Sequence, residues 1–287
     1  MKLASPAKLN LFFRVLRKRE DGFHEIASLY QAINLMDEIQ IEPSTKDVFT
    51  CTDPTLDLGA SNLVARALTI FRNRTQIHHP VAIHLRKEIP IEAGLAGGSG
   101  NAATTLWGLN ELFNRPASID DLKHWSAEMG SDISFFFSCG TAYCEGRGEK
   151  VTTVDSLPFS AWIAKPSFGL KTPTVYAHTN LGILKARDPR ETMRKIFAQE
   201  GGYFNDLESA AFHLEPRLKK LKHQLEEIGF DKVVMTGSGT AFFCLGNCKP
   251  SPLYGVDFYF VQNAQRKSNA WYSYHKNEVC HEAEKDF

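Results

Sequence analysis

The sequence predicts a fold that mixes helices and strands in one large or two modest domains. The chain has 287 residues, which is enough to bury a substantial core. Segments in which apolar and polar residues alternate, typical of strands, lie between segments with the apolar spacing of helices. A proline-bounded stretch, Pro158–Pro166, predicts a domain junction. We therefore expect domains at residues 1–157 and 158–287.

Composition and charge exclude several classes of protein. The chain carries 33 basic and 33 acidic residues, so no net field favours binding to nucleic acid or to an anionic membrane. The N-terminus lacks the apolar centre of a secretory leader, and no apolar run approaches the length of a membrane span. The sequence therefore predicts a soluble, cytoplasmic protein that binds neither nucleic acid nor membranes.

The six cysteines show no disulfide rhythm. Cys244 and Cys248 could form a metal-binding group with Cys280 and His281, but Cys244 lies in an apolar strand pattern. Buried, reduced thiols are the better interpretation, and we expect no metal centre built from protein ligands alone.

The N-terminal segment Leu3–Arg17 predicts a strand because its residues alternate. The alternation defines two faces, with Leu9, Leu11, Phe13 and Val15 on one and Lys8, Asn10, Phe12 and Arg14 on the other. Lys8 and Asn10 should therefore project side by side. A lysine on a strand is usually solvated, so the strand alone does not make Lys8 functional.

Further elements follow along the chain. Predicted strands are Asp37–Ile41, Val81–Leu85, Thr141–Glu145, Glu149–Val154, Ala161–Ala164 and Phe258–Val261. Predicted helices begin after the caps Asn62 and Ser118, at Thr172 and at Asn205, and another runs from Leu218 to Ile228 before Gly229. The stretch Ser44–Leu58 is polar and turn-like, and the tail from Gln265 resembles no element that we can place.

The stretch Pro90–Ala103 is the most informative part of the sequence. Four glycines fall within seven residues, interleaved with Ser99 and followed by Asn101: Gly94, Gly97, Gly98 and Gly100. A helical pattern follows at once. A glycine-rich segment at a helix N-terminus exposes backbone N–H groups that lack intrahelical partners, and the helix dipole adds positive potential. The stretch therefore predicts a phosphate site, which fits this density of glycine better than a flexible loop with a helix cap does.

Two other phosphate motifs fit less well. The P-loop ends in Gly-Lys-Ser/Thr, which this stretch lacks. Gly98–Ala103 does match the G-x-G-x-x-A dinucleotide pattern, but the nearest predicted strand, Val81–Leu85, ends well before it. Asp120 and Asp121, where a second strand should end, open a helix instead. A dinucleotide-dependent oxidoreductase is therefore disfavoured.

Two further motifs accompany the glycine-rich stretch. In Gly130–Phe137, Asp132 precedes an apolar run. Taken alone, this position would give Asp132 no role beyond that of a helix N-cap. Val233–Leu245 is typical of two strands joined by a glycine turn, which alone would be a plain hairpin.

Together with Ser5–Asn10, these motifs resemble those of the GHMP kinases, the superfamily of galactokinase, homoserine kinase and mevalonate kinase. The resemblance runs from Leu3 to Leu245, with the motifs in the family's order. The stretch Pro90–Ala103 matches the second motif of the family, except that Ala96 replaces a glycine and Gly100 replaces a serine. The missing hydroxyl at Gly100 leaves open how Mg²⁺ is held.

The chain is most similar to a branch of this superfamily whose acceptor is a cytidine diphosphate alcohol. The branch signature R-x-D-G-[Tyr/Phe]-His matches Arg19–His24, and a Thr-Pro-x-x-aromatic pattern matches Thr172–Tyr176. Without the resemblance, Asp21-Gly22 would be read as a hairpin turn and Tyr176 as a half-buried core residue. The resemblance implies that Phe23, His24 and Tyr176 hold the cytidine end of the substrate.

The resemblance also implies the other site residues. Asp132 would accept the hydroxyl proton, and Lys8 would orient Asp132 and offset developing charge; these two are the predicted catalytic residues. Predicted nucleotide-binding residues are Asn62, Lys87, Gly94, Leu95, Ala96, Gly97, Gly98, Ser99, Gly100 and Asn101. Predicted acceptor-binding residues are Asn10, Phe23, His24, Thr172, Tyr176, Gly237, Ser238 and Gly239. Asn62 and Lys87 also have plainer interpretations, as a helix cap and a surface lysine.

The implied fold is a two-domain α+β fold, in which a domain similar to ribosomal protein S5 domain 2 precedes a ferredoxin-like domain. The implied reaction transfers the γ-phosphoryl group of ATP, with Mg²⁺, to the 2-hydroxyl of the cytidine diphosphate alcohol in isoprenoid precursor synthesis. We expect a monomer or a weak homodimer that binds this small molecule.

Two alternative functions are also compatible with the sequence. One is a kinase for another small alcohol such as homoserine, which would not need the aromatic set at Phe23, His24 and Tyr176. The other is an RNA-binding protein of S5-like fold, against which the zero net charge argues.

Overall fold

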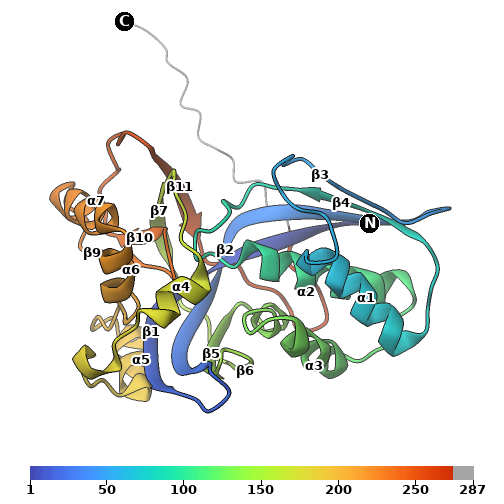
Figure 1. Cartoon of the computed structure of the whole chain (residues 1–287), viewed down its shortest axis with the longest axis horizontal. Coiled ribbons are helices and arrows are strands. Elements are labelled where there is room, and N and C mark those ends of the chain that lie inside the picture. The colour runs from blue at the N-terminus through green and yellow to red at the C-terminus, as the bar shows by residue number, and fades with distance from the viewer. Residues whose placement is uncertain (274–287) are drawn as a thin grey trace, which may run out of the picture.

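The structure, a computed structural model, describes residues 1–273 and arranges them around two sheets (Figure 1). Seven strands form the larger sheet in the order β3-β4-β2-β1-β8, with β5 also paired to β2 and β6 to β5. Four strands form the second sheet in the order β11-β7-β10-β9.

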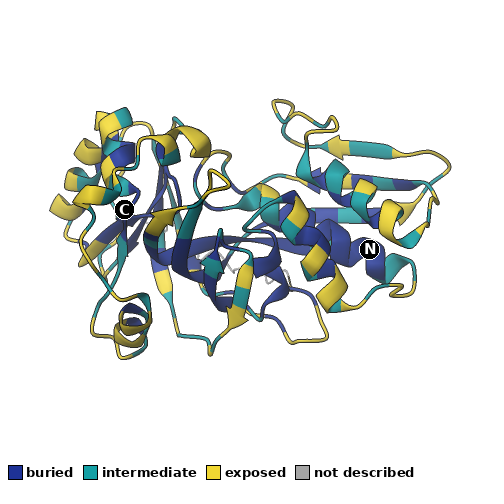
Figure 2. Ribbon diagram, turned by 60° about the horizontal axis from the view of Figure 1, so that its bottom comes forward, coloured by how far each residue is buried: buried dark blue, intermediate teal, exposed yellow. Residues whose placement is uncertain are grey.

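The larger sheet belongs mainly to the first half of the chain. Its strands are β1 (Lys2–Lys18), β2 (His24–Pro43), β3 (Val48–Cys51), β4 (Val81–Arg86), β5 (Thr141–Gly146), β6 (Lys150–Thr153) and β8 (Phe204–Asn205). The helices that accompany it are α1 (Leu63–Thr75), α2 (Gly97–Leu112), α3 (Ile119–Met129) and the 3-10 turn η1 (Ser134–Phe137). Because α2 packs on β1 and β2 and is covered by its neighbours, it is buried along most of its length (Figure 2).

The second sheet is formed by β7 (Ser160–Pro166), β9 (Lys232–Met235), β10 (Phe242–Leu245) and β11 (Val256–Gln262). The helices of this half are α4 (Thr172–Ala177), the 3-10 turn η2 (Leu181–Ile183), α5 (Pro189–Phe197), α6 (Glu208–Leu214) and α7 (Pro216–Glu227). In chain order the strands lie 4-1-3-2 and all pair antiparallel, as in a ferredoxin-like sheet. The described segment between β10 and β11 has no helix, which is a departure from that fold.

Several sequence predictions are confirmed by the local geometry. Asn62 caps α1 through its side chain, and Ser118 forms a capping box at the start of α3. β5 and β6 form the predicted hairpin around Gly146 and Gly148. Gly229, which follows α7, adopts a φ of 103°, a conformation that favours glycine at this position.

The predicted faces of β1 hold from Lys8 to Leu11 and are wrong beyond Leu11. The register between β1 and β2 shifts between Asn10 and Phe12, so the alternation is broken there. Phe12 consequently packs in the same cluster as Leu9 and Leu11, whereas Phe13 packs in another cluster with Val15.

Three other segments also differ from the prediction. The strand expected at Asp37–Ile41 is the end of β2, whose first part is buried on both faces and therefore shows no alternation. The stretch expected to be turn-like contains the short strand β3. Asn205, expected at a helix start, lies in β8, and α6 begins at Glu208.

The two sheets share part of their core. One cluster joins Leu9 and Leu11 of the larger sheet to Ile163 and Phe243 of the second. The domain boundary predicted near residue 157 thus falls within a continuous apolar contact, and it stays a prediction. None of the helices in residues 1–273 is long and apolar enough to cross a bilayer.

Candidate active site

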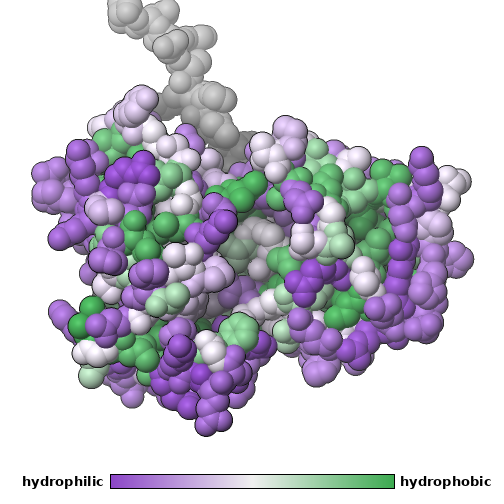
Figure 3. Space-filling model, in the orientation of Figure 1, coloured by the Kyte–Doolittle hydropathy of each residue, from purple (hydrophilic) through white to green (hydrophobic). Residues whose placement is uncertain are grey.

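Most of the predicted site residues line one cavity of about 960 Å³, whose walls come from both halves of the chain. Figure 3 shows a hollow between the two lobes. Three predicted residues are not part of its wall: Asn10, Gly100 and Gly239. Among residues 1–273, no group of three or more His, Cys, Asp or Glu side chains could hold a metal ion; Cys280 and His281 lie outside the described residues.

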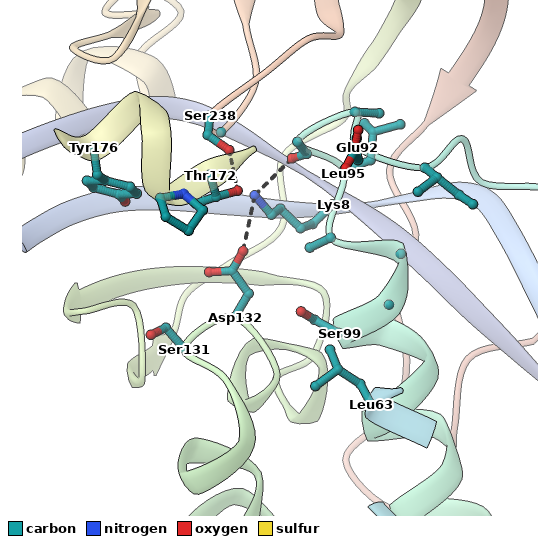
Figure 4. Close-up of a pocket in the computed structure, with 18 of the residues that line it drawn as sticks. Lys8, Leu63, Glu92, Leu95, Ser99, Ser131, Asp132, Thr172, Tyr176 and Ser238 are labelled. Carbon is teal, nitrogen blue, oxygen red and sulfur yellow. Dashed lines mark hydrogen bonds and ion pairs between the residues drawn. The ribbon is translucent and has the colours of Figure 1, made fainter. Parts of the chain in front are cut away.

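Lys8 and Asp132 face each other in this cavity (Figure 4). Lys8 Nζ lies 3.6 Å from Oδ2 of Asp132, and the Lys8 side chain is only 3% exposed. Burial lowers the pKa of Lys8 below its ordinary value of 10.5, while the nearby carboxylate of Asp132 opposes the shift. Asp132 makes no cap for η1, whose N-cap is Ile133 without a side-chain hydrogen bond. The aspartate is therefore available to the cavity.

Asn10 supports Lys8 from behind the cavity wall. Its Oδ1 accepts a hydrogen bond of 2.7 Å from Lys8 Nζ, as expected for neighbours on one strand face. Its Nδ2 donates to Ser28, and its backbone N–H donates to Thr236 Oγ1. Since Asn10 is fully buried, it positions Lys8 rather than lining the cavity.

Tyr30 is a site residue that the sequence did not reveal. Its hydroxyl donates a 2.9 Å hydrogen bond to Oδ1 of Asp132, and Lys8 Nζ lies 4.9 Å from its ring centroid. Tyr30 pairs with Asn10 in the β1–β2 register. Only this pairing between strands indicates that Tyr30 belongs to the site, and no local sequence motif predicts the pairing.

The glycine-rich stretch forms the loop and first turn of α2. The N-cap, Ala96, adopts a left-handed conformation and contributes no side-chain cap, in contrast to the caps of α1 and α3. A Cβ at Gly98 would meet only Leu63 at 3.7 Å, so this position opens toward the cavity. The uncapped N–H groups of a long helix thus face the cavity, as an anion site requires.

Gly100 has a different reason to be glycine. A Cβ there would lie 2.6 Å from the carbonyl oxygen of Pro6, because α2 approaches β1 closely at this point. The position faces β1 and not the cavity, so a serine hydroxyl there would be directed away from the cavity. The absence of that hydroxyl therefore removes nothing from the cavity wall.

The glycine-rich stretch Pro90–Ala103 packs against the glycine turn of Val233–Leu245. A Cβ at Gly94 would lie 2.1 Å from the carbonyl oxygen of Thr236, and Gly94 has a φ of 76°. Ala241 donates its backbone N–H to Ala93 at 3.1 Å, and the carbonyl of Gly94 accepts from Lys8. Glycine at position 94 thus allows the glycine-rich stretch to pack against the turn between β9 and β10, beside Lys8.

Asn62 and Lys87 line the cavity, but their polar atoms already have partners. Asn62 caps α1 and donates to the carbonyl of Asp57. Lys87 Nζ lies 2.9 Å from a carboxylate oxygen of the buried Asp37, which also accepts two backbone N–H groups. Lys87 is therefore a buried, paired lysine and not the surface lysine of the plainer interpretation.

The far end of the cavity is aromatic. His24 and Tyr176 lie 5.2 Å apart between ring centroids, at 30° to each other. Phe23 is 53% exposed, and the guanidinium of Arg147 lies 5.0 Å from its ring. Thr172 and Ser238 exchange a 2.7 Å hydrogen bond across the two segments that carry them. Arg147, which the sequence did not single out, also lines the cavity.

Burial sets the protonation of the aromatic end. It raises the pKa of Tyr176, so the phenol stays neutral. Burial, aided by the charge of Lys18, lowers the pKa of His24 below its ordinary value of 6.5. At neutral pH this end therefore presents uncharged rings, which suits stacking on a base.

The family model of the GHMP kinases N terminal domain matches residues 62–140. A crystal structure of 4-(cytidine 5'-diphospho)-2C-methyl-D-erythritol kinase has a TM-score of 0.74 and 32% identity, over 86% of this chain and 91% of that one. A homoserine kinase from Cytophaga hutchinsonii has a TM-score of 0.71 over 92% of this chain and 95% of that one, but at 16% identity it shows a likeness of fold alone.

Similar sequences agree with this structural match. The 4-diphosphocytidyl-2-C-methyl-D-erythritol kinase of Mentha piperita, described as chloroplastic, is 40% identical, over 94% of this chain and 72% of that protein. The enzyme of the same name from Protochlamydia amoebophila (strain UWE25) is 46% identical over 276 residues, which cover 95% of this chain and 93% of that protein. At this identity over nearly the whole of both proteins, the chain belongs to the 4-diphosphocytidyl-2-C-methyl-D-erythritol kinases of the GHMP kinase superfamily.

Proposed function

We propose that this chain transfers the γ-phosphoryl group of ATP to the 2-hydroxyl of 4-diphosphocytidyl-2-C-methyl-D-erythritol, in the non-mevalonate route to isoprenoid precursors. The observation that carries the proposal is the Lys8–Asp132 pair, which shares one cavity with the uncapped N-terminus of α2. A base, a cation and an anion site in one cavity are the parts that phosphoryl transfer to an alcohol needs.

The donor would lie along the N-terminus of α2. Backbone N–H groups from Gly97 to Ser99 would receive the phosphates, with the helix dipole adding to their pull. The apolar side chains of Leu56, Leu63 and Leu85, which line this part of the cavity, would accommodate the purine. Asn62 and Lys87 would shape this wall rather than donate to the nucleotide, because their amide and amine are already bonded.

Magnesium fits the oxygen donors of this chain. The hydroxyl of Ser99 and the carboxylate of Asp132 both line the cavity, and oxygen ligands from one or two side chains, completed by phosphates and water, are what Mg²⁺ prefers. When bound, Mg²⁺ supplies charge neutralisation on the phosphoryl oxygens.

The acceptor would lie from the aromatic end toward Asp132. Tyr176, His24 and Phe23 would hold the cytosine, and Arg147 would approach the diphosphate. Asp132 would accept the proton of the 2-hydroxyl as the oxygen attacks phosphorus. Lys8 would hold Asp132 in place and offset the charge that develops between acceptor and donor.

Both halves of the chain would contribute to the acceptor site. Residues 1–157 would supply the donor site together with Phe23, His24 and Arg147, and residues 158–287 would add Thr172, Tyr176 and the Gly237–Gly239 turn. The protein would work in the cytoplasm as a monomer or a weak homodimer on small molecules alone.

A phosphoryl-transfer assay with three acceptors tests this function. Purified protein with Mg-ATP should phosphorylate 4-diphosphocytidyl-2-C-methyl-D-erythritol, and should act poorly on free 2-C-methyl-D-erythritol and on homoserine. The Asp132→Asn variant, matched to the wild type in thermal melting, should lose about 10²–10⁴-fold in kcat. Homoserine as the preferred acceptor, or an Asp132→Asn variant with wild-type turnover, would overturn the proposal.

A further inference from the structure

The chain returns to the larger sheet after its last strand. We call residues 264–272 the C-terminal strap; Figure 1 shows it in red, passing behind α2. Ala264 donates its backbone N–H to the carbonyl of Ala32 at 2.8 Å. A Cβ at Gly140 would lie 2.3 Å from the carbonyl oxygen of Ala264, and Gly140 has a φ of 111°, so glycine is required for this approach.

Arg266 is the centre of the strap. It is 8% exposed, and its Nε donates to the carbonyl of Ser138 at 2.8 Å. A second guanidinium nitrogen donates to the carbonyl of Phe137, and the third donates to carbonyls within the strap, including that of Ala270 at 2.9 Å. The guanidinium therefore ties the C-terminal end of η1 to the strap through charge-assisted hydrogen bonds.

Trp271 attaches the strap to two other elements. Its Nε1 lies 2.9 Å from the carbonyl oxygen of Ala4 in β1 and 3.2 Å from Oγ1 of Thr104 in α2. Its ring stacks on Trp107 of α2, with 5.0 Å between centroids. The Arg266 guanidinium lies 5.4 Å from both indole rings, so the two strap residues and Trp107 form one buried cluster.

The three elements that this cluster joins are those that carry the catalytic groups. η1 begins two residues after Asp132, α2 begins with the glycines of the phosphate site, and β1 carries Lys8. None of the strap residues lines the cavity, so the cluster holds these elements from outside the catalytic pocket. A shift of η1 relative to α2 would change the separation between the base and the donor.

We propose that Arg266 and Trp271 are positioning residues for phosphoryl transfer, which fix Asp132 relative to the phosphate site and to Lys8. The inference rests on the proposed function. Loss of the guanidinium leaves two buried carbonyls without their donors and frees the end of η1. A misplacement of about 1 Å can reduce a rate by as much as 10²-fold, even when its cause lies far from the chemistry.

The test compares Arg266→Met, Arg266→Lys and Trp271→Phe with the full-length wild type. Arg187→Met is the control, because Arg187 is a partly buried arginine that pairs with Asp206 and lies over Phe204, away from η1. Calorimetric titration with an ATP analogue and with the cytidine diphosphate alcohol gives the fraction of binding-competent sites. Steady-state kinetics then give kcat per competent site and KM for each substrate.

A positioning role predicts a split between kcat and KM. Arg266→Met should lose about 10- to 100-fold in kcat per competent site, with both KM values within about threefold of wild type. Arg266→Lys keeps the positive charge but not the planar set of N–H donors, so its kcat should lie between those of the wild type and Arg266→Met. Trp271→Phe should lose less kcat than Arg266→Met. Arg187→Met should keep wild-type kcat per competent site.

The opposite result is equally defined. If Arg266→Met only lowers the melting temperature and the fraction of competent sites, with kcat per site unchanged, the strap is structural and the inference fails. A wild type that cannot phosphorylate the cytidine diphosphate alcohol would instead refute the proposed function, so the two failures are distinguishable.

Discussion

The hydroxyl of Tyr30 donates a hydrogen bond of 2.9 Å to Oδ1 of Asp132, on the carboxylate whose other oxygen faces Lys8. Tyr30 is 1% exposed, and burial raises its pKa well above 10, so its hydroxyl remains a donor throughout the range in which enzymes work. One buried donor and one buried cation thus hold the two oxygens of a single aspartate. Asp132 therefore has little freedom to rotate.

This geometry predicts a specific loss in Tyr30→Phe. The ring and its packing remain, but the hydrogen bond to the charged carboxylate is lost, a contact that contributes roughly 1.5–3 kcal/mol. We expect kcat to fall about tenfold or more, with the KM for ATP unchanged. Steady-state kinetics measure this, with Tyr143→Phe as the matched control because Tyr143 is also buried and does not line the cavity. Equal kinetics in the two variants would remove Tyr30 from the positioning of Asp132.

Two glycines of the same helix turn should respond to substitution in different ways. Gly98→Val adds its side chain on the cavity side, so the variant should fold normally and bind ATP much more weakly, by about 10-fold or more at a cost of about 1.4 kcal/mol. Gly100→Ala adds a methyl group 2.6 Å from the Pro6 carbonyl oxygen, so it should lower the melting temperature instead. Calorimetry with ATP and thermal unfolding of both variants separate the two effects. A Gly98→Val variant that also lost affinity for the cytidine substrate to the same extent would indicate a disordered loop.

The pH dependence of turnover should report Lys8. Because burial lowers its pKa, Lys8 loses its proton below pH 10.5, and kcat should decrease as the pH rises through that lowered pKa. Burial raises the pKa values of Tyr30 and Cys144, two buried groups near Lys8, so their deprotonation moves further from neutral pH. In Lys8→Arg the guanidinium stays charged, and the alkaline decrease should vanish from whatever activity remains. A decrease that persisted unchanged in Lys8→Arg would have to be assigned to another group.

The sequence predicted those features that depend on local pattern. The caps Asn62 and Ser118 and the glycine-rich start of α2 each depend on a few neighbouring residues, and the structure places them as expected. Lys8 and Asn10 are adjacent because they are two residues apart on one strand.

The missed residues depend on contacts between distant segments. Tyr30 lies near Asp132 because the β1–β2 register pairs it with Asn10. Its part of β2 is buried on both faces, so no alternation in the sequence marks a functional side. Arg147 lines the cavity from the turn of the β5–β6 hairpin, and its motif predicts only that turn. Part of the tail that resembled nothing packs as the C-terminal strap, through Arg266 and Trp271; residues 274–287 lie outside the described part of the chain.

The aromatic end should determine which alcohol the enzyme accepts. Tyr176 and His24 come from α4 and β2, in different halves of the chain, and their rings lie 5.2 Å apart. A base stacked on an aromatic side chain gains ~1–3 kcal/mol, so Tyr176→Ala should weaken binding of the cytidine diphosphate alcohol about 10- to 100-fold. Affinity for ATP should change little, because Tyr176 lies at the other end of the cavity from the α2 glycines (Figure 4).

Specificity gives a sharper measure of the same contact than affinity does. The ratio of kcat/KM for the cytidine diphosphate alcohol to that for free 2-C-methyl-D-erythritol should be large in the wild type. It should fall in Tyr176→Ala and fall further in the Tyr176→Ala, His24→Ala double variant, because only the cytidylyl substrate uses the rings. Phe23→Ala should have a smaller effect than Tyr176→Ala, since the Phe23 ring is half exposed and already faces Arg147. A double variant that kept the wild-type ratio would mean that the cytosine is held elsewhere, and that these rings serve only to pack α4 against β1 and β2.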